Sequence, residues 1–194
     1  MPKFLAFAGS SRKDSFNRKL IRIAAEGARD AGAEVEVIDL LDFPMPIFNQ
    51  DLESAEGMPE KAREFKELMV EHDGFLIASP EYNGSFSPLL KNSIDWASRT
   101  ESEGEAPLAA FRGKTAVLMA ASPGSYGGMR GLIFLRMLLS NLGLILLPEQ
   151  VTVPFAFRAF DESGSLVDEK QHRAVFGLGL RLAEFYTARK LAGD

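Results

Sequence analysis

A run of polar side chains follows the first apolar stretch of the chain and offers the chemistry of an anion-binding site. The loop reads GSSRKDSFN over residues 9–17 and lies immediately before a helical pattern. The beginning of a helix presents unpaired backbone N–H groups and the positive end of the helix dipole, and both favour an anion. Ser10, Arg12, Ser15 and Asn17 add hydroxyl, guanidinium and amide donors at this point. The loop is therefore predicted to bind phosphate.

The glycine pattern of this loop limits the size of the anion. The loop contains one glycine, so the dinucleotide fingerprint G-x-G-x-x-G is absent, and the G-K-S/T ending of the P-loop is missing. We therefore expect a single phosphate rather than a pyrophosphate. The alternative is a plain helix cap formed by Ser15 or Asn17, with Arg12 as a surface charge. One cap, however, needs only one of the four hydroxyl and amide side chains in the loop.

Two later loops carry a similar excess of turn and polar residues. Residues 80–85, PEYNGS, follow an apolar run, and an irregular loop of this kind would leave backbone N–H and C=O groups free to bind the polar edge of a flat heterocycle. Ser87 and Pro88 then have the form of an N-cap and a first helical residue. Residues 122–131, SPGSYGGMRG, contain glycines that permit positive φ and close approach of the backbone. This glycine-rich loop is a weak signal alone, and it is strengthened by the other two polar loops beside it.

Composition excludes several other chemistries. The chain has 194 residues, a net charge of −5 and no cysteine. Nucleic acid or an anionic membrane would require a basic surface, so neither is expected as a partner. Without cysteine there is no disulfide, thiolate nucleophile or Cys-ligated metal, and a reducing cytoplasm is expected. The two histidines, His72 and His172, lie in charged stretches and are expected on the solvated surface, so we predict no metal site and no catalytic histidine.

The elements that must position the three loops alternate along the chain. Apolar runs predict strands, and 3.6-residue periods predict helices. In the helix after Pro88, Trp96 lies beside the buried stripe and is expected to be partly exposed, packed rather than in contact with a ligand. The strands are predicted over residues 3–8, 34–40, 74–78, 114–121 and 144–153, the last either continuous or broken at Pro148, and the helices over residues 16–31, 59–71, 88–99, 128–142 and 168–190.

This alternation predicts an α/β protein with a mainly parallel sheet covered on both faces, in a single domain over residues 1–194. Ligands of such sheets bind beyond the carboxyl ends of the strands, which is where the three loops lie. The apolar segment 132–147 is interrupted by Arg136 and Asn141 and is too short to span a bilayer, for which roughly 20 residues are needed. We expect it to be a buried helix that stops at Gly143, followed by a strand.

Four motifs in this order resemble a known family, the NAD(P)H-dependent FMN reductases of flavodoxin-like fold, which includes quinone, azo-dye and chromate reductases. The first loop resembles the family's G-S-x-R-x-x-S-x-N, and residues 38–51, IDLLDFPMPIFNQD, resemble I-D-L-x-D-x-P-x-P-x-F-x-x-D. PEYNGS with LKNSIDW resembles P-E-Y-N-x-S and L-K-N-A-I-D-W, and SPGSYGG resembles S-x-G-x-x-G-G. The chain departs from the pattern at Ser87-Pro88, where the family often has Pro-Gly, so the proline of this chain is displaced by one position.

The resemblance implies a fold, a cofactor and an activity. The fold would be a flavodoxin-like three-layer sandwich with a five-stranded parallel sheet in the order 2-1-3-4-5. The cofactor would be FMN, with NADPH or NADH as co-substrate and a quinone, free flavin or azo compound as the small-molecule electron acceptor. Hydride would pass from the nicotinamide to the flavin and then to the acceptor, so no side chain would act as acid, base or nucleophile.

The resemblance also assigns cofactor-binding residues and an oligomer. Homodimers or homotetramers are typical of the family, and residues 42–51 are a candidate interface arm, with an intrachain covering loop as the alternative. The implied cofactor-binding residues are Ser10, Arg12, Ser15, Phe16 and Asn17 around the phosphate, Pro80, Glu81, Tyr82, Asn83 and Gly84 along the isoalloxazine ring, mostly through the backbone, and Ser122, Gly124 and Gly127 at its border.

Two rival functions remain open at this point. A flavodoxin-like electron carrier would bind FMN without reacting directly with NAD(P)H, although such carriers are usually more acidic than this chain. A flavin-free domain that binds a phosphate ligand would share only the first loop.

Overall fold

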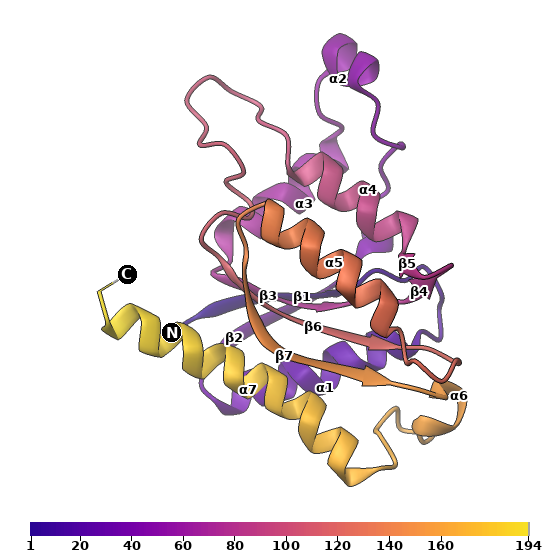
Figure 1. Cartoon of the computed structure of the whole chain (residues 1–194). Helices are drawn as coiled ribbons and strands as arrows, with labels where there is room; N and C mark the ends of the chain where they lie inside the picture. The colour runs from indigo at the N-terminus through magenta and orange to yellow at the C-terminus, as the bar shows by residue number, and fades with distance from the viewer. Residues whose placement is uncertain (194) are drawn as a thin grey trace.

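The central sheet is parallel, with its five strands in the order β2-β1-β3-β6-β7, in the computed structural model, which describes residues 1–193 (Figure 1). Counted by sheet strands alone, this is the predicted order of the flavodoxin-like fold. The strands are β1 (Lys3–Ala8), β2 (Glu34–Asp39), β3 (Gly74–Ala78), β6 (Thr115–Ala121) and β7 (Ile145–Val153), and a separate hairpin consists of β4 (Glu81–Tyr82) and β5 (Ser85–Phe86). The helices are α1 (Phe16–Asp30), α2 (Gln50–Glu56), α3 (Glu60–Glu71), α4 (Pro88–Ala97), α5 (Met129–Asn141), α6 (Ala156–Ala159) and α7 (Glu169–Leu191), with a 3-10 turn η1 (Leu40–Asp42).

The predicted strands and helices are confirmed, with ends that differ by no more than two residues. The last strand is continuous, but its pairing with β6 shifts register between Leu146 and Gln150, so Pro148 lies at an irregularity rather than at a break. Sequence patterns did not indicate α2, η1, α6 or the hairpin β4–β5, all of which are short.

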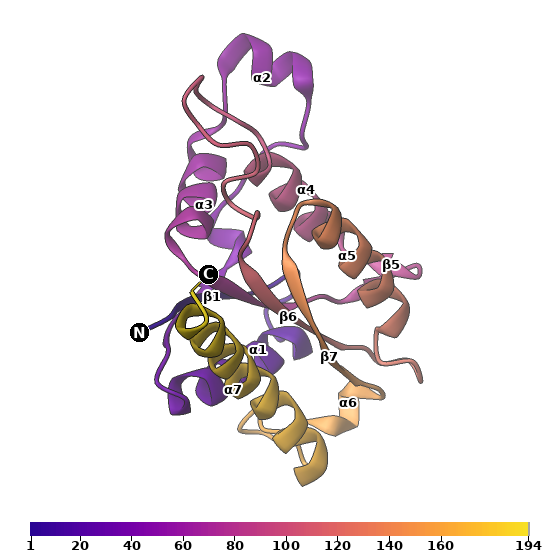
Figure 2. The same cartoon turned by 60° about the vertical axis from the view of Figure 1, so that its left-hand side comes forward.

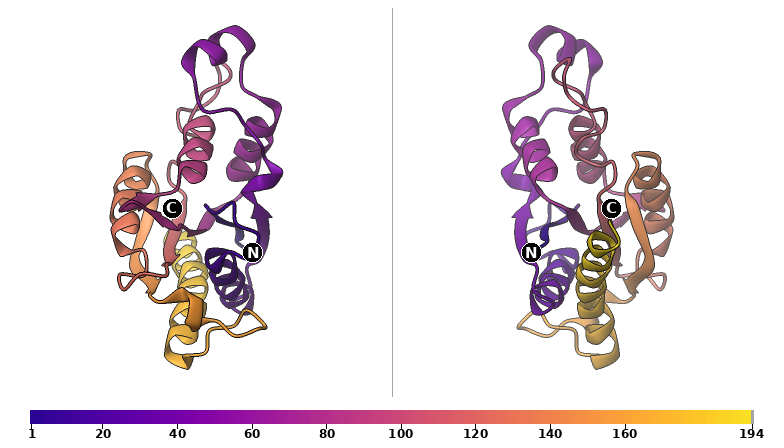
Figure 3. Two further views of the ribbon diagram at one scale, coloured as in Figure 1. Left: turned by 90° about the vertical axis from the view of Figure 1, so that its right-hand side faces the viewer. Right: turned by 90° about the vertical axis from the view of Figure 1, so that its left-hand side faces the viewer.

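Alternate residues of the strands form two separate cores. The face that includes Phe4 and Ala6 packs against α1 and α7, and the face that includes Leu5 and Phe7 packs against α3, α4 and α5. The two helical layers lie on opposite sides of the sheet in every view (Figures 2 and 3). This three-layer arrangement brings the carboxyl ends of all five strands to one edge.

The apolar segment over residues 132–147 comprises most of helix α5, which lies in this second layer, and the beginning of β7. The helix α5 ends at Asn141, Gly143 follows with φ 87°, and β7 begins two residues later. The predicted helix, stop and strand are therefore confirmed. Within residues 1–193, no helix has the length and apolarity needed to cross a membrane.

The arm between β2 and α3 is held by two side chains of α4. Asn92 accepts a hydrogen bond from the Phe48 amide (2.8 Å) and donates one to the Pro46 carbonyl (2.9 Å). Trp96 donates from its indole to the same carbonyl (2.8 Å) and meets the Phe48 ring edge-on. Trp96 is fully buried, so its packing role is confirmed, but the expectation of partial exposure was wrong because the arm covers it.

His72 also departs from expectation. It is buried, with Nδ1 2.6 Å from the Leu68 carbonyl oxygen and Nε2 3.5 Å from a carboxylate oxygen of Glu36. The prediction of a solvated surface histidine was wrong here. His72 caps the end of α3, and its ring contacts the Leu68 carbonyl and Glu36 instead of solvent. A charged sequence neighbourhood did not reveal this position.

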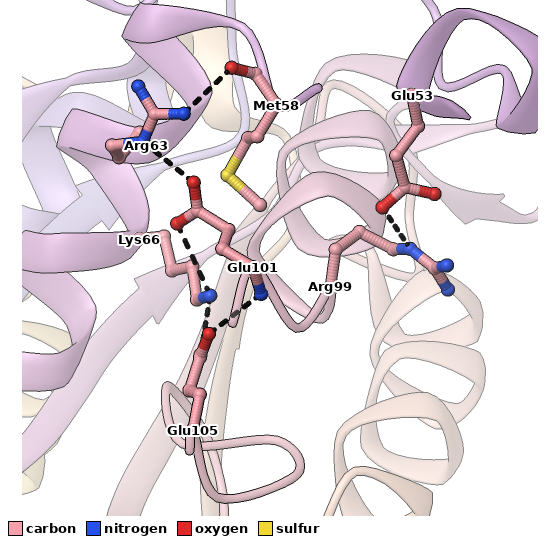
Figure 4. A network of polar contacts seen from close by, with 7 residues as sticks. All are labelled: Glu53, Met58, Arg63, Lys66, Arg99, Glu101 and Glu105. Atoms are coloured by element: carbon pink, nitrogen blue, oxygen red, sulfur yellow. Dashed lines mark hydrogen bonds and ion pairs between the residues drawn. The ribbon is translucent and has the colours of Figure 1, made fainter. Parts of the chain in front are cut away.

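The loop after α4 is tied to α3 by a buried lysine (Figure 4). Lys66, whose side chain is 5% exposed, contacts Glu105 at 2.5 Å and Glu101 at 3.5 Å. Arg63 pairs with Glu101 from the same helix, and the Glu101 amide donates to Glu105 (2.8 Å). Burial alone would raise the pKa of Glu105, but the hydrogen bonds from the Glu101 amide and from Lys66, with the charge of Lys66, lower it below its ordinary value.

Helices α1 and α7 approach each other so closely that glycine is required at their contact. A Cβ atom on Gly27 of α1 would lie 1.9 Å from the Phe176 carbonyl oxygen, and one on Gly179 of α7 would lie 1.8 Å from the Ala24 carbonyl oxygen. The same helix offers a contrast at Gly177, where an added Cβ would meet no atom within 4 Å. Close packing of α1 against α7 therefore depends on Gly27 and Gly179.

We predict opposite effects for two alanine substitutions in α7. Gly179→Ala should lower the free energy of unfolding by about 1–3 kcal/mol or more, because the new methyl group forces the helices apart. Gly177→Ala should raise it by roughly 1 kcal/mol, because alanine is the better helix former. Urea unfolding followed by circular dichroism measures both. A loss of similar size in the two variants would contradict the close-packing argument.

We also predict an acid-dependent contribution from Glu105. Its pKa in the folded state lies below the unfolded value near 4.5, so the ionised carboxylate stabilises the fold above that pH, and the contribution is lost as pH falls through the folded pKa. Glu105→Gln should therefore be less stable than wild type at pH 7, and the difference should shrink below about pH 4.5. The matched control is Glu103→Gln, an exposed residue of the same loop. An equal difference at both pH values would refute the assignment.

Candidate functional site

The three polar loops meet at the carboxyl edge of the sheet. They follow β1, β3 and β6, which are adjacent strands, and they enclose a pocket of about 80 Å³. Figure 1 shows this edge, where the hairpin β4–β5 and the loop before α5 lie beyond the arrowheads of the strands. The pocket is lined by Ser10, Arg12, Ser15, Phe16, Asn17, Pro80, Glu81, Tyr82, Ala121, Ser122 and Pro123.

Nine of the predicted cofactor-binding residues line this pocket and four do not. Asn83 and Gly84 form the tip of the hairpin, with φ 52° and 84°. Gly124 is exposed, and Gly127 is buried with its Cα side against the backbone of Val153 and Pro154. Two lining residues, Ala121 and Pro123, were not predicted, because nothing in their type signals ligand contact and only their position at the end of β6 could have suggested it.

The first loop presents buried hydroxyls at the beginning of α1. Ser10 is 2% exposed and Ser15 is 4% exposed. Each accepts a long backbone hydrogen bond of 3.4 Å, from Arg12 and Arg18 respectively, and within residues 1–193 neither hydroxyl donates one. The first two amides of α1 have no acceptor inside the helix. These groups are hydrogen-bond donors without partners at the positive end of a helix, which is a favourable environment for an anion.

Asn17 joins this loop to the end of β6. Its side-chain amide donates to the Ala121 carbonyl oxygen (3.0 Å) and accepts from the Ala121 amide (2.9 Å), across 104 positions of sequence. The residue is 3% exposed. The side-chain amide engages both backbone groups of Ala121, so Asn17 positions the loop. Its backbone N–H is a further donor at the start of α1.

Ser87 joins the first loop to the second. Its hydroxyl donates to the Gly9 carbonyl oxygen (2.5 Å) and accepts from the Leu90 amide (3.2 Å), so it serves as the N-cap of α4 as predicted. Gly9 permits this approach, since a Cβ atom there would lie 2.7 Å from that of Leu90. The helix begins at Pro88, so the displaced proline of this chain still occupies the first helical position.

The second loop is more regular than predicted. Residues 81–86 pair as a two-residue β-hairpin, with Glu81 opposite Phe86 and Tyr82 opposite Ser85. The premise of an irregular loop with free backbone groups was therefore wrong: the Asn-Gly pair forms the tight turn that this dipeptide favours. The Asn83-Gly84 dipeptide is the feature of the sequence that indicates this turn.

Glu81 fastens the hairpin to the third loop. Its carboxylate, 7% exposed, accepts from the amides of Arg130 (3.1 Å) and Gly131 (3.3 Å) and pairs with the Arg130 guanidinium. An acidic side chain at these first amides of α5 also faces the positive end of that helix. The side chain is therefore committed to α5, and Glu81 borders the pocket while its charge is already compensated.

Arg18 holds the first loop from the other side. Its guanidinium donates to the Ser10 carbonyl oxygen (3.2 Å) and to the Asp39 carboxylate (2.6 Å) at the end of β2. The sequence analysis did not identify this residue, because it lies one position beyond the motif. It fixes the backbone of the loop, and Arg12, which is exposed, is the cationic residue that lines the pocket.

Comparisons with known proteins agree with this geometry. A family model described as NADPH-dependent FMN reductase matches residues 2–158. The chain is 35% identical over 174 residues to the NAD(P)H-dependent FMN reductase PA1204 of Pseudomonas aeruginosa, covering 89% of both chains. It is 36% identical over 196 residues to an NAD(P)H:quinone oxidoreductase of Solanum tuberosum, covering 98% of this chain and 95% of the relative. Among solved structures, the flavoenzyme NAD(P)H:(acceptor) oxidoreductase FerB of Paracoccus denitrificans matches with a TM-score of 0.78 at 28% identity, over 95% and 96% of the two chains.

The pocket geometry predicts a specific role for the Asn17 amide. Asn17→Asp keeps the size and the acceptor but places a carboxylate oxygen against the Ala121 carbonyl. The free energy of unfolding should fall by about 1–3 kcal/mol, because a buried hydrogen bond is replaced by repulsion. The control is Asn49→Asp, an exposed N-cap at which the two residues are nearly equivalent. Equal effects in the two variants, measured by urea unfolding, would show that the Asn17–Ala121 contact is unimportant.

Proposed function

The chain belongs to the NADPH-dependent FMN reductase family, and from this membership we propose that its pocket at the carboxyl edge of the sheet holds FMN and that quinones are its electron acceptors. The chain is an NAD(P)H-dependent oxidoreductase with FMN as cofactor. Among its relatives, one is named NAD(P)H:quinone oxidoreductase and another 2-hydroxy-1,4-benzoquinone reductase. Their names support a quinone as the acceptor here.

The observation that carries the assignment of the FMN site is the pair of buried hydroxyls without acceptors. Ser10 and Ser15 lie beside the unpaired amides that begin α1, and Arg12 is exposed next to them. A phosphate supplies the acceptor oxygens and the negative charge that this set of donors lacks. The residues therefore fit the phosphate of FMN, with Asn17 contributing a backbone N–H and holding the loop in place.

We assign the flat ring system of FMN to the rim of the pocket. Pro80 is buried, the hairpin backbone borders the opening, and Tyr82 lines it with a side chain that is 42% exposed. FMN supplies the redox chemistry when bound, accepting a hydride from NAD(P)H and passing electrons to the acceptor. The chain supplies binding and orientation, and the three tied loops keep the backbone of the pocket in position without a ligand.

The rival electron carrier is disfavoured, because the chain belongs to a family of NADPH-dependent FMN reductases. A carrier would have the same phosphate loop and fold, so geometry at the phosphate does not separate the two. The formal net charge of −5 is mild for a carrier. Relatives named as reductases and oxidoreductases favour the enzyme.

We also propose a homo-oligomer in which the candidate interface arm over residues 42–51, with α2 continuing from it, contacts a second copy, and a cytoplasmic location. Near Pro46 and Phe48 the arm packs on α4. The following helix α2 has no buried residue, although Glu53 pairs with Arg99 (2.7 Å). Ile47 is 85% exposed. The arm projects beyond the helical layers (Figures 1 and 3). The residues near Phe48 thus act as an intrachain covering loop, and the exposed part of the segment is the part that we propose as the interface. The absence of cysteine is compatible with a reducing compartment.

The enzyme assignment is tested by anaerobic titration of the FMN-loaded protein with NADPH and, separately, with NADH. We expect rapid loss of the flavin absorbance with at least one nucleotide and its return on adding a benzoquinone. An electron carrier would bind FMN but bleach only slowly. Protein that stays colourless after addition of FMN would contradict both flavin functions.

The assignment of the phosphate loop is tested by the double variant Arg12→Ala with Ser15→Ala. We expect the Kd for FMN to rise by about tenfold or more, because each hydrogen bond to a charged group contributes about 1.5–3 kcal/mol. Arg22→Ala is the matched control, since it removes an exposed cation from the same helix away from the pocket. Quenching of FMN fluorescence on titration with apoprotein gives the affinities. An unchanged Kd in the double variant would mean that the phosphate lies elsewhere.

A further inference from the structure

A second pocket lies at the opposite edge of the sheet, before the strands begin. Asp73 immediately precedes β3 and Lys114 immediately precedes β6, and the end of α7 closes the other side. The length of β3 places this pocket about 16 Å or more from the flavin site, at about 3.3 Å per residue. Its volume of about 350 Å³ is that of a small-ligand site rather than of a protein-docking surface. Its charged and hydroxyl-bearing lining residues are Asp73, Arg112, Lys114, Tyr186, Arg189 and Lys190.

The pocket concentrates positive charge in a chain whose net charge is −5. Four of its lining side chains are cationic and one is a carboxylate. Within residues 1–193, Arg112, Lys114 and Lys190 make no ion pair with a carboxylate, and Arg112 makes no side-chain hydrogen bond. Against the one carboxylate, these three cations alone leave an excess of two positive charges at one concave site, which favours an anion with more than one negative charge.

Contacts with the protein hold three of these cations at the pocket. Lys114 donates to the Val70 carbonyl (2.7 Å) and to that of His72, which uses two of the three N–H groups of its ammonium. Arg189 donates to the Gly113 carbonyl (2.8 Å). Lys190 lies over the Tyr186 ring, with its Nζ 5.6 Å from the ring centroid. Lys114 and Lys190 are therefore anchored by neutral groups rather than by carboxylates.

The single carboxylate is turned to other partners. Asp73 accepts from the Tyr186 hydroxyl (2.6 Å) through one oxygen and from the Lys3 amide (2.8 Å) through the other. Burial, the hydrogen bond to Asp73 and its charge raise the pKa of Tyr186 to about 12, so the phenol remains a donor to Asp73 at neutral pH. Burial lowers the pKa of Lys114, so a bound anion would also favour its charged form.

We propose that this pocket binds a dianionic phosphate group, carried either by free phosphate or by a phosphate monoester. The guanidinium of Arg112 offers the forked pair of donors that matches phosphate oxygens, and Lys114 and Lys190 add point charges on two sides. The ligand joins the turn before β6 to the last turn of α7. Its binding therefore stabilises the folded state in proportion to its concentration.

The test is calorimetric titration of the FMN-loaded protein, in which the first phosphate loop is already filled, with inorganic phosphate in a chloride buffer of matched ionic strength. We expect saturable binding, and at least tenfold weaker binding in the double variant Arg112→Gln with Lys190→Gln. Both residues are exposed, so the variant should fold normally. The charge-matched control is Lys170→Gln with Arg173→Gln, two exposed cations near the start of α7, which should bind as wild type does.

A parallel titration with glycerol phosphate separates the two sources of the phosphate group. Equal affinities would identify free phosphate as sufficient, and tighter binding of the monoester would show that the organic part contributes; both outcomes support the pocket. Absence of saturable binding of either probe, or equal binding by the Arg112–Lys190 double variant, would overturn the proposal. Arg112 and Lys190 lie far from the flavin loop. We therefore expect the variants to bind FMN as wild type does, whether or not phosphate binds to the second pocket.

Discussion

The double hydrogen bond between the Asn17 amide and the backbone of Ala121 is the contact on which the proposed flavin pocket depends. It joins the first loop to the end of β6, which is the fourth strand of the sheet in sequence order. It satisfies a buried donor and a buried acceptor. Ser87 fixes Gly9 to α4, and Glu81 fixes the hairpin to α5. Three loops that follow different strands thus become one rigid rim, and a ligand meets donors that are already in position. Preorganised donors lower the cost of binding because little ordering remains to be done.

This arrangement also separates residues that hold the pocket from residues that meet the ligand. Asn17, Glu81 and Ser87 have their side chains committed to the protein, whereas Ser10, Ser15 and Arg12 keep donors available. The flavodoxin-like scaffold makes the separation possible, because buried parallel strands deliver the loops to one edge while the loop residues themselves vary. A cofactor that carries the chemistry requires only this kind of placement, which is why no side chain is expected to act as acid, base or nucleophile.

The sequence was sufficient for the scaffold but not for the ties between loops. Fully apolar runs such as residues 74–78 identify buried strands, and Ser15 and Ser87 identify helix starts, because both are local physical effects. The partner of Asn17 lies 104 positions away, so no local pattern could reveal that its amide is engaged. The same reason explains Trp96 and His72, whose burial depends on segments that only the fold brings together. The hairpin differs, since Asn83-Gly84 is a local turn signal that the sequence did contain.

The most direct test of the central claim is amide hydrogen exchange of the protein with and without FMN. If the cofactor occupies the pocket formed by the tied loops, binding should slow exchange in residues 9–17, 79–87 and 121–128. The amides around the Arg112–Lys190 pocket at the far edge should exchange as before. Protection confined to the loop after β2, or absent from residues 9–17, would contradict the assignment of the flavin to this pocket.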